Sequence, residues 1–440
     1  MNRAQFAVRN IFPHALALGV LVAGAACGSS DGQLAAPSSG GSGAAGTGGA
    51  AGTGGDAGTS GAGGSSSAGS AGNGGAPLDP PASVWAKPIT GHFPAKYYVG
   101  LTRGYHLAQA AGITLKTYSS GSDIAKKSYE QAPWQEVLDR CEADPNSMFV
   151  AVTHARWDEY FGLDEFFKDM THGVTMPKEV GDYLADVRET LLNLAKCKCS
   201  AVISFEPDPM MATKGIVRAE FDGSTRNVPA KIAESGFDDA LELGPPQTLA
   251  GFWQVIDYMR YKYAPNVLLA PVAKREGGTE PAGGWDTDPD VQDEADYYNT
   301  FDVHWDALAY NYNPTVGPHP DAEYLSMARK YAAIARKFKQ PTGRSVRAII
   351  WKTVVRPEHY DTTIPEIDWN LDHLSFEMRN IQGLADAGLA GQVIGYGNEM
   401  VMYEDTHLPP MLECWLKEYH GGAEVPGCIR HGTIGEVDVP

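Results

Sequence analysis

One glutamate stands where a side chain could do acid–base chemistry, directly after a buried apolar segment. Residues 201–205 are apolar and β-prone, and Glu206 follows them, with Pro207 next. Alternate side chains of a strand share a face, so we expect Glu206 on the face that carries Val202 and Ser204. If the larger side chains of this strand face helices, the glutamate projects into an open mouth, where a carboxyl group can donate or accept a proton.

Acid–base catalysis of a bond cleavage commonly uses two carboxyl groups. One is protonated and assists the leaving group, and the second is ionised and attacks the substrate or activates water. Glu276 and Glu399 stand near the ends of two other predicted strands. Each is a candidate nucleophile or base beside Glu206, and both alternatives stay open.

Aromatic, amide and charged residues also follow the predicted strands and indicate a ligand surface. Ligand sites are mostly apolar with a few placed polar groups, and aromatic faces can stack on apolar faces of a ligand. The predicted substrate-binding residues are His154, Arg156, Asp208, Tyr310, Asn311, Trp351, Lys352, Tyr396 and Asn398. Trp285 and Trp305 are further candidates for stacking surface. Lys352 is interpreted as the charge partner of a mouth carboxylate, with a Schiff-base lysine as the alternative.

Eight short apolar segments alternate with helical patterns from about residue 95 onward. The predicted strands are 97–101, 113–118, 149–153, 201–205, 267–272, 307–310, 347–354 and 392–396, and the clearest predicted helices are 180–198, 249–263, 322–338 and 371–387. Near-continuous apolar strands suit a parallel sheet that is covered on both faces. The alternation predicts an α/β fold, a (β/α)8 TIM barrel, whose reactive groups gather at the carboxyl ends of the strands.

The sequence Phe205-Glu206-Pro207 resembles the Asn-Glu-Pro motif of retaining (β/α)8-barrel glycoside hydrolases of clan A, the cellulases, mannanases and their relatives. Those enzymes carry the acid/base glutamate at the end of strand four, and Glu206 follows the fourth predicted strand. The resemblance implies a glycoside hydrolase over about residues 90–420. Phe205 replaces an Asn that bonds a sugar hydroxyl, and the seventh predicted strand has no acid until Glu358, where the family has its nucleophile. A barrel that binds glycan without cleaving it is therefore the alternative.

The N-terminal residues predict export. Two arginines precede an apolar run at 15–26, which is too short to span a membrane. Cys27 follows small residues and resembles the cysteine of a bacterial lipobox, although Gly24 stands where that motif usually has Leu. We predict a lipoprotein signal peptide at 1–27 and acylation of Cys27. The expected location is the cell envelope, as a lipid-anchored protein of the outer membrane or cell surface, or outside the cell after release.

Composition divides the remainder of the chain in two. Residues 28–76 are almost wholly Gly, Ala, Ser and Thr, with too little apolar surface to offset the entropy of ordering, and are predicted to be a disordered linker. Residues 77–440 have a globular composition and are predicted to form the barrel domain. The only expected membrane contact is through the N-terminal lipid.

Charge, motifs and cysteines restrict the partners. A net charge of −19 argues against nucleic acid and suits a neutral polysaccharide or oligosaccharide substrate. The sequence carries no dinucleotide-binding, zinc or nucleophile-elbow motif, so we expect neither a cofactor nor a metal.

Export permits disulfides. Cys414 and Cys428 are the predicted pair, and Cys141 is expected to join either Cys197 or Cys199.

Overall fold

The computed structural model describes residues 88–101, 105–115, 117–120, 139, 141–153, 170–205, 207–273, 279–312, 321–339, 345–353, 373–394, 408–428 and 433–440. The predicted signal peptide, Cys27 and the predicted linker lie outside these residues. Within the described ranges, no helix has both the length and the apolar character that a membrane crossing requires.

The strands of the described residues are β1 (Tyr98–Leu101), β2 (Thr117–Ser120), β3 (Met148–Thr153), β4 (Ser200–Phe205), β5 (Val267–Leu269), β6 (Val272–Ala273), β7 (Ala307–Tyr312), β8 (Arg347–Thr353) and β9 (Leu389–Ile394). The α-helices are α2 (Tyr105–Ala110), α5 (Met170–Gly173), α6 (Pro177–Leu194), α7 (Pro207–Glu220), α8 (Asp238–Leu243), α9 (Leu249–Tyr263), α10 (Pro289–Asn299), α11 (Asp321–Arg336), α12 (His373–Arg379), α13 (Ile381–Asp386) and α14 (Pro410–Gly421). Three short 3-10 helices are η2 (Thr225–Asn227), η3 (Ala233–Ser235) and η4 (Trp285–Thr287).

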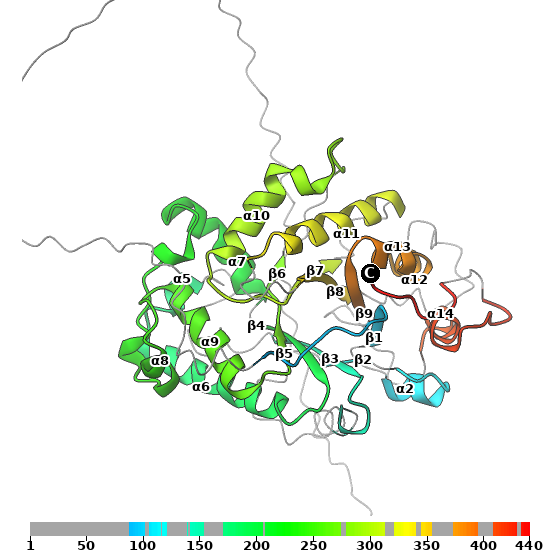
Figure 1. Cartoon of the computed structure of the whole chain (residues 1–440), viewed down its shortest axis with the longest axis horizontal. Helices are drawn as coiled ribbons and strands as arrows, with labels where there is room; N and C mark the ends of the chain where they lie inside the picture. The colour runs from blue at the N-terminus through cyan, green and yellow to red at the C-terminus, as the bar shows by residue number, and fades with distance from the viewer. Residues whose placement is uncertain are drawn as a thin grey trace, which may run out of the picture. The chain divides into compact units, whose positions relative to one another are not determined.

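The strands form one sheet in the order β5-β4-β3-β2-β1-β9-β8-β7-β6. Every pairing between these strands is parallel. Figure 1 shows the strands gathered centrally, with helices such as α6, α9 and α11 outside them. Parallel strands need crossover connections, and the alternating helices supply them. The predicted mixed α/β class with a parallel sheet is therefore confirmed.

The two edge strands of the sheet are successive pieces of one chain segment. Only Ala270 and Pro271 separate β5, which pairs with β4, from β6, which pairs with β7. The Ala270 N–H donates to the Ile203 carbonyl at 3.0 Å, and the Ala309 N–H donates to the Pro271 carbonyl at 2.9 Å. Pro271 has no N–H and interrupts the strand. In the described residues the ladder therefore does not close into a barrel, although its two edges meet in one segment.

The two faces of the sheet belong to different apolar clusters. The inner cluster consists of Tyr98, Met148, Val150, Val202, Leu268, Ala270, Val272, Ala307, Ala309, Ile349, Trp351, Ala390 and Val393, with Ile89, Phe93 and Met211 packed against it. The outer cluster contains the alternate strand side chains together with residues of the surrounding helices. An apolar sheet face must be buried. The inner face packs largely on itself, which requires a curved sheet.

The predicted elements differ from the observed ones where local signals are weak. The helix predicted at 249–263 coincides with α9. The strand predicted at 113–118 is misplaced, because β2 begins only at Thr117. The single helix predicted at 371–387 is two helices, because Asn380 leaves the helical conformation, with φ −114° and ψ 24°.

A buried ionic network stabilises the sheet near the segment that contains β5 and β6, where the two edges meet. The guanidinium of Arg260 in α9 is fully buried and donates to the carboxylates of Asp257 at 2.5 Å and Asp306 at 3.1 Å. Asp306 exchanges two hydrogen bonds with Leu269 of β5: its N–H donates to the carbonyl at 2.8 Å, and its carboxylate accepts from the N–H at 3.0 Å. Burial alone raises the pKa of Asp257, but Arg260 and His304 outweigh that effect and hold it at about 2. Asp257 and Arg260 therefore stay ionised at neutral pH, and the network joins α9, β5 and the residue before β7.

Replacing Asp306 with Ala should lower the free energy of unfolding by about 3–5 kcal/mol, because the buried Arg260 loses one partner and the Leu269 N–H loses its acceptor. The matched control is Asp286→Ala, which breaks the exposed ion pair with Arg336 and should cost about 0–1 kcal/mol. Urea unfolding of both variants measures the difference. Equal losses of unfolding free energy in the two variants would show that the buried network does not stabilise the sheet.

Candidate active site

Most predicted site residues lie outside the described part of the chain. These are Glu206, Glu276, Glu399, His154, Arg156, Tyr396 and Asn398. Asp208, Asn311 and Lys352 are described through their backbone only, within α7, β7 and β8. The described carboxyl ends of the strands define the surroundings of the site.

The strand β4 alternates between the two clusters as the sequence predicted. Val202 belongs to the inner cluster, whereas Ile203 and Phe205 belong to the outer cluster. Ser204, on the Val202 side by alternation, is buried. The next residue in the sequence after Phe205 is Glu206, and α7 begins immediately beyond it. A single residue therefore separates the end of β4 from the start of α7.

Two hydrogen bonds hold the first half of helix α7 to neighbouring helices. The Met170 N–H donates to the Thr213 hydroxyl at 2.6 Å, and the Tyr297 hydroxyl donates to the Met210 carbonyl at 3.2 Å. These bonds fix the chain just after β4 to α5 and α10. Helix α7 is absent from the predicted helices. Pro207 at its first position was the available signal, because proline favours the first turn of a helix.

A β-bulge shifts the register between β7 and β8. Tyr310 lies opposite Ile350 and Asn311 lies opposite Lys352, so Trp351 is the extra residue. The bulge makes two predicted substrate-binding residues register partners at the carboxyl ends of their strands. Trp351 is 3% exposed and packs in the inner cluster, which leaves little of its indole for a ligand. Bulges are common beside active sites, where they redirect a strand.

Three aromatic residues that were expected at the ligand surface lie on the other side of the sheet. Tyr310 is 1% exposed, belongs to the outer cluster and stacks on Tyr331 of α11, with ring centroids 4.2 Å apart. Trp285 and Trp305 belong to the same outer cluster. The expectation for Tyr310 is corrected accordingly: strand alternation turns its ring toward the helices, where it fills core volume.

Tyr98, the first residue of β1, fills the inner cluster from one end. It is buried, and burial raises the pKa of its phenol far above the usual range, so the hydroxyl stays neutral. Its ring lies against Gly391 of β9, where an added Cβ would stand 2.3 Å from the Tyr98 Cγ. Glycine inside an apolar strand is a sign of such a close approach.

The five cysteines in the described part of the chain form one isolated pair and one cluster of three. Cys414 is bonded to Cys428, as the sequence favoured. Cys141 is bonded to Cys199, and Cys197 beside them is a free, buried thiol. Burial raises the pKa of Cys197 to about 12, so it is protonated at neutral pH. Within the described residues, this cluster is the group of side chains close enough to hold a metal ion, but the disulfide occupies two of its three sulfurs.

Comparison with protein-family models and with curated proteins finds no match. Among solved structures, a GH26 β-mannanase from Bacteroides ovatus is similar with 13% identity and a TM-score of 0.41, covering 76% of this chain and 85% of that one. An endo-β-1,4-mannanase from Cellulomonas fimi is similar with 12% identity and a TM-score of 0.42, covering 82% of this chain and 80% of that one. Likeness at this level carries no argument about activity, and the case for a function rests on the chain's own residues.

Replacing Gly391 with Ala should destabilise the domain by about 1–3 kcal/mol, because the new methyl group overpacks the inner cluster against Tyr98. Gly215→Ala is the matched control, since nothing lies within 4 Å of its added Cβ in helix α7, and it should stabilise by about 0.4–1 kcal/mol. Thermal and urea unfolding compare the two variants. A Gly391→Ala protein as stable as wild type would contradict the tight contact.

Proposed function

We propose that the domain hydrolyses glycosidic bonds of a neutral polysaccharide or oligosaccharide, with Glu206 as general acid/base. Glu399 or Glu276 serves as the second carboxylate, as nucleophile or base. The reaction needs one protonated and one ionised carboxyl group on opposite sides of the scissile bond. Both candidates follow parallel strands in the sequence, β9 and β6, as Glu206 follows β4.

The observation that carries the proposal is the alternation of β4. Val202 belongs to the inner cluster and Phe205 to the outer cluster, so we expect the same period to direct Glu206 toward the inner side. A carboxyl group there would stand above an apolar interior that includes Trp351. Low polarity around a carboxyl favours its protonated form, which is the form that a general acid requires.

The proposed architecture is a (β/α)8 barrel. Its support is the inner cluster, which is built from strands on both halves of the sheet, and the segment from β5 to β6 that bonds to β4 and to β7. In such barrels the carboxyl ends of the strands surround one mouth. Residues that follow β4, β6 and β9 would then share a cavity.

Export and lipid anchoring at Cys27 are part of the same proposal. Two disulfides, Cys141–Cys199 and Cys414–Cys428, support an oxidising location because cytosolic proteins rarely keep such bonds. A cell that is labelled with radioactive palmitate should transfer label to the wild-type protein and not to a Cys27→Ser variant. Equal labelling of both proteins would refute acylation at this residue.

Replacing Glu206 with Gln should lower the rate of hydrolysis about 10²–10⁴-fold while leaving the unfolding temperature unchanged, because Gln keeps the shape and loses the proton. Release of reducing ends from a panel of neutral polysaccharides measures the rate. The matched control is Glu220→Gln, an exposed glutamate in the last turn of α7, which should keep full activity. A fully active Glu206→Gln protein would refute the assignment.

The second carboxylate is identified by the same assay on Glu276→Gln and Glu399→Gln. The variant that lacks the true partner carboxylate should lose activity to a similar degree, and the other variant should not.

A second candidate function is glycan binding without cleavage. It is favoured by β8, which reads Arg-Ala-Ile-Ile-Trp-Lys-Thr and supplies no carboxylate. Binding of a polysaccharide by wild-type protein without release of reducing ends would favour this alternative.

A further inference from the structure

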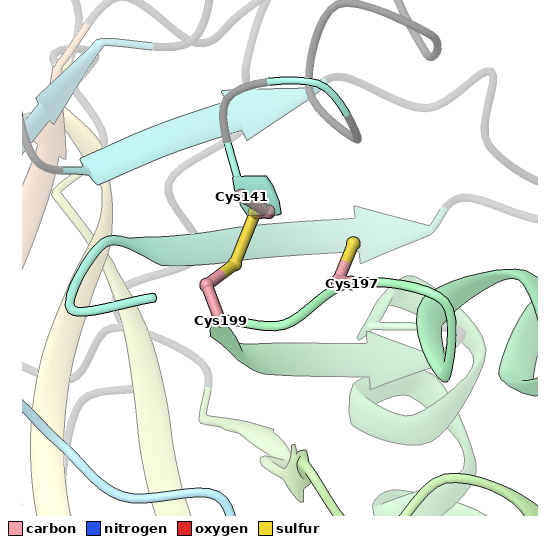
Figure 2. A group of neighbouring side chains, drawn as sticks. All are labelled: Cys141, Cys197 and Cys199. Carbon is pink, nitrogen blue, oxygen red and sulfur yellow. A yellow bond between two sulfur atoms is a disulfide. The ribbon is translucent and has the colours of Figure 1, made fainter. Parts of the chain in front are cut away.

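Three sulfur atoms meet at the amino end of β4, as Figure 2 shows. The ligand atoms of Cys141, Cys197 and Cys199 all lie within 4.8 Å of one another, and all three residues are buried. Cys141 is bonded to Cys199, and the Cys197 thiol is free. Because a disulfide exchanges when a thiolate attacks one of its sulfurs, the free thiol has a target within reach.

We propose that this cluster is a thiol–disulfide exchange centre in which Cys141 has two alternative partners, Cys199 and Cys197. The Cys197 thiol gives its proton to water, and the resulting thiolate attacks the Cys141 sulfur. A bond forms between Cys141 and Cys197 while the Cys141–Cys199 bond breaks. Cys199 leaves as a thiolate and takes up a proton. One disulfide and one thiol are present before and after, so no external oxidant or reductant is required.

The surrounding structure holds both partners in place whichever of them is bonded. The side-chain amide of Asn266 donates to the carbonyls of Leu194, Cys197 and Cys199 at 3.0, 3.2 and 3.1 Å. This single amide therefore fixes the loop that carries both candidate cysteines. We expect the exchange to move the cysteine side chains and to keep these backbone contacts.

The exchange would change which residue near the start of β4 is covalently bonded to Cys141. Cys199 directly precedes Ser200, the first residue of β4, and Ser200 pairs with Met148, the first residue of β3. The Cys141–Cys199 bond therefore anchors the start of the strand, whereas a Cys141–Cys197 bond anchors the loop two residues earlier. The inference does not rest on the proposed function, since it concerns the sulfur atoms alone.

Charged neighbours of the cluster lie at its exposed rim. The Lys198 ammonium pairs with Glu142 at 2.9 Å, and both side chains are exposed. Lys196 donates to Asn193 at 2.7 Å. Burial of Cys197 raises its pKa to about 12. Since only the thiolate attacks, the exchange rate should rise about tenfold per pH unit in the range where the protein stays folded.

The test is a non-reducing peptide map of the full chain after rapid blocking of free thiols with N-ethylmaleimide. Trypsin cleaves after Lys196 and Lys198, so Cys197 and Cys199 fall in different peptides. In the Cys199→Ser variant, Cys141 should be bonded to Cys197 with no free thiol between them. A folded Cys199→Ser protein in which both thiols are blocked by the reagent would overturn the proposal.

Wild-type protein provides a second measurement that does not depend on the folding of that variant. During incubation at pH values up to about 10, below the Cys197 pKa, the Cys141–Cys197 peptide should appear in the map at the expense of Cys141–Cys199, and it should appear faster at higher pH. The control is Cys197→Ser, which should keep only Cys141–Cys199 at every pH. Wild-type protein that remains folded and shows only Cys141–Cys199 throughout would equally overturn the proposal.

Discussion

The fold depends on how the two edges of a parallel sheet are held together. The edge strands β5 and β6 are consecutive in the chain and are separated only by Ala270 and by Pro271, which lacks an N–H and interrupts the strand. Asp306, directly before β7, adds a link across this junction, because its backbone and its carboxylate both bond to Leu269 of β5. That carboxylate is buried and is stabilised by the Arg260 guanidinium. Breaking such a pair is costly, because it leaves an uncompensated charge in a low-dielectric interior.

Once the edges are joined, the two faces of the sheet acquire different roles. The outer face is covered by amphipathic helices and takes the large rings, of which Tyr310 stacked on Tyr331 is an example. In the described residues, the inner cluster consists of strand side chains and Ala270, with Ile89, Phe93 and Met211 of α7 packed against it. Tyr98 against Gly391 and Trp351 near Ala309 belong to this face. The apolar filling of the interior leaves the carboxyl ends of the strands as the place for polar chemistry.

The candidate site was predictable in part. The apolar run from Ala201 to Phe205 identified β4 and its two faces, and Val202 lies on the side that the alternation required. The expectation for Tyr310 failed because a tyrosine beside polar residues resembles ligand surface in sequence, whereas its strand position directs it into the helix layer. The β-bulge at Trp351 could not be predicted from the sequence either, because a register shift depends on the partner strand.

The sequence by itself determined the alternation of strands and helices, the period of β4 and the pairing of Cys414 with Cys428, because each follows from near neighbours along the chain. Only the tertiary structure decided that Cys141 bonds to Cys199 with Cys197 beside them, and that Arg260 serves both Asp257 and Asp306. Asp257 and Arg260 are three residues apart, but the Arg260–Asp306 and Cys141–Cys199 contacts join residues 46 and 58 positions apart in the sequence. Their partners are selected by burial and by the curvature of the sheet, for which a local pattern carries no signal.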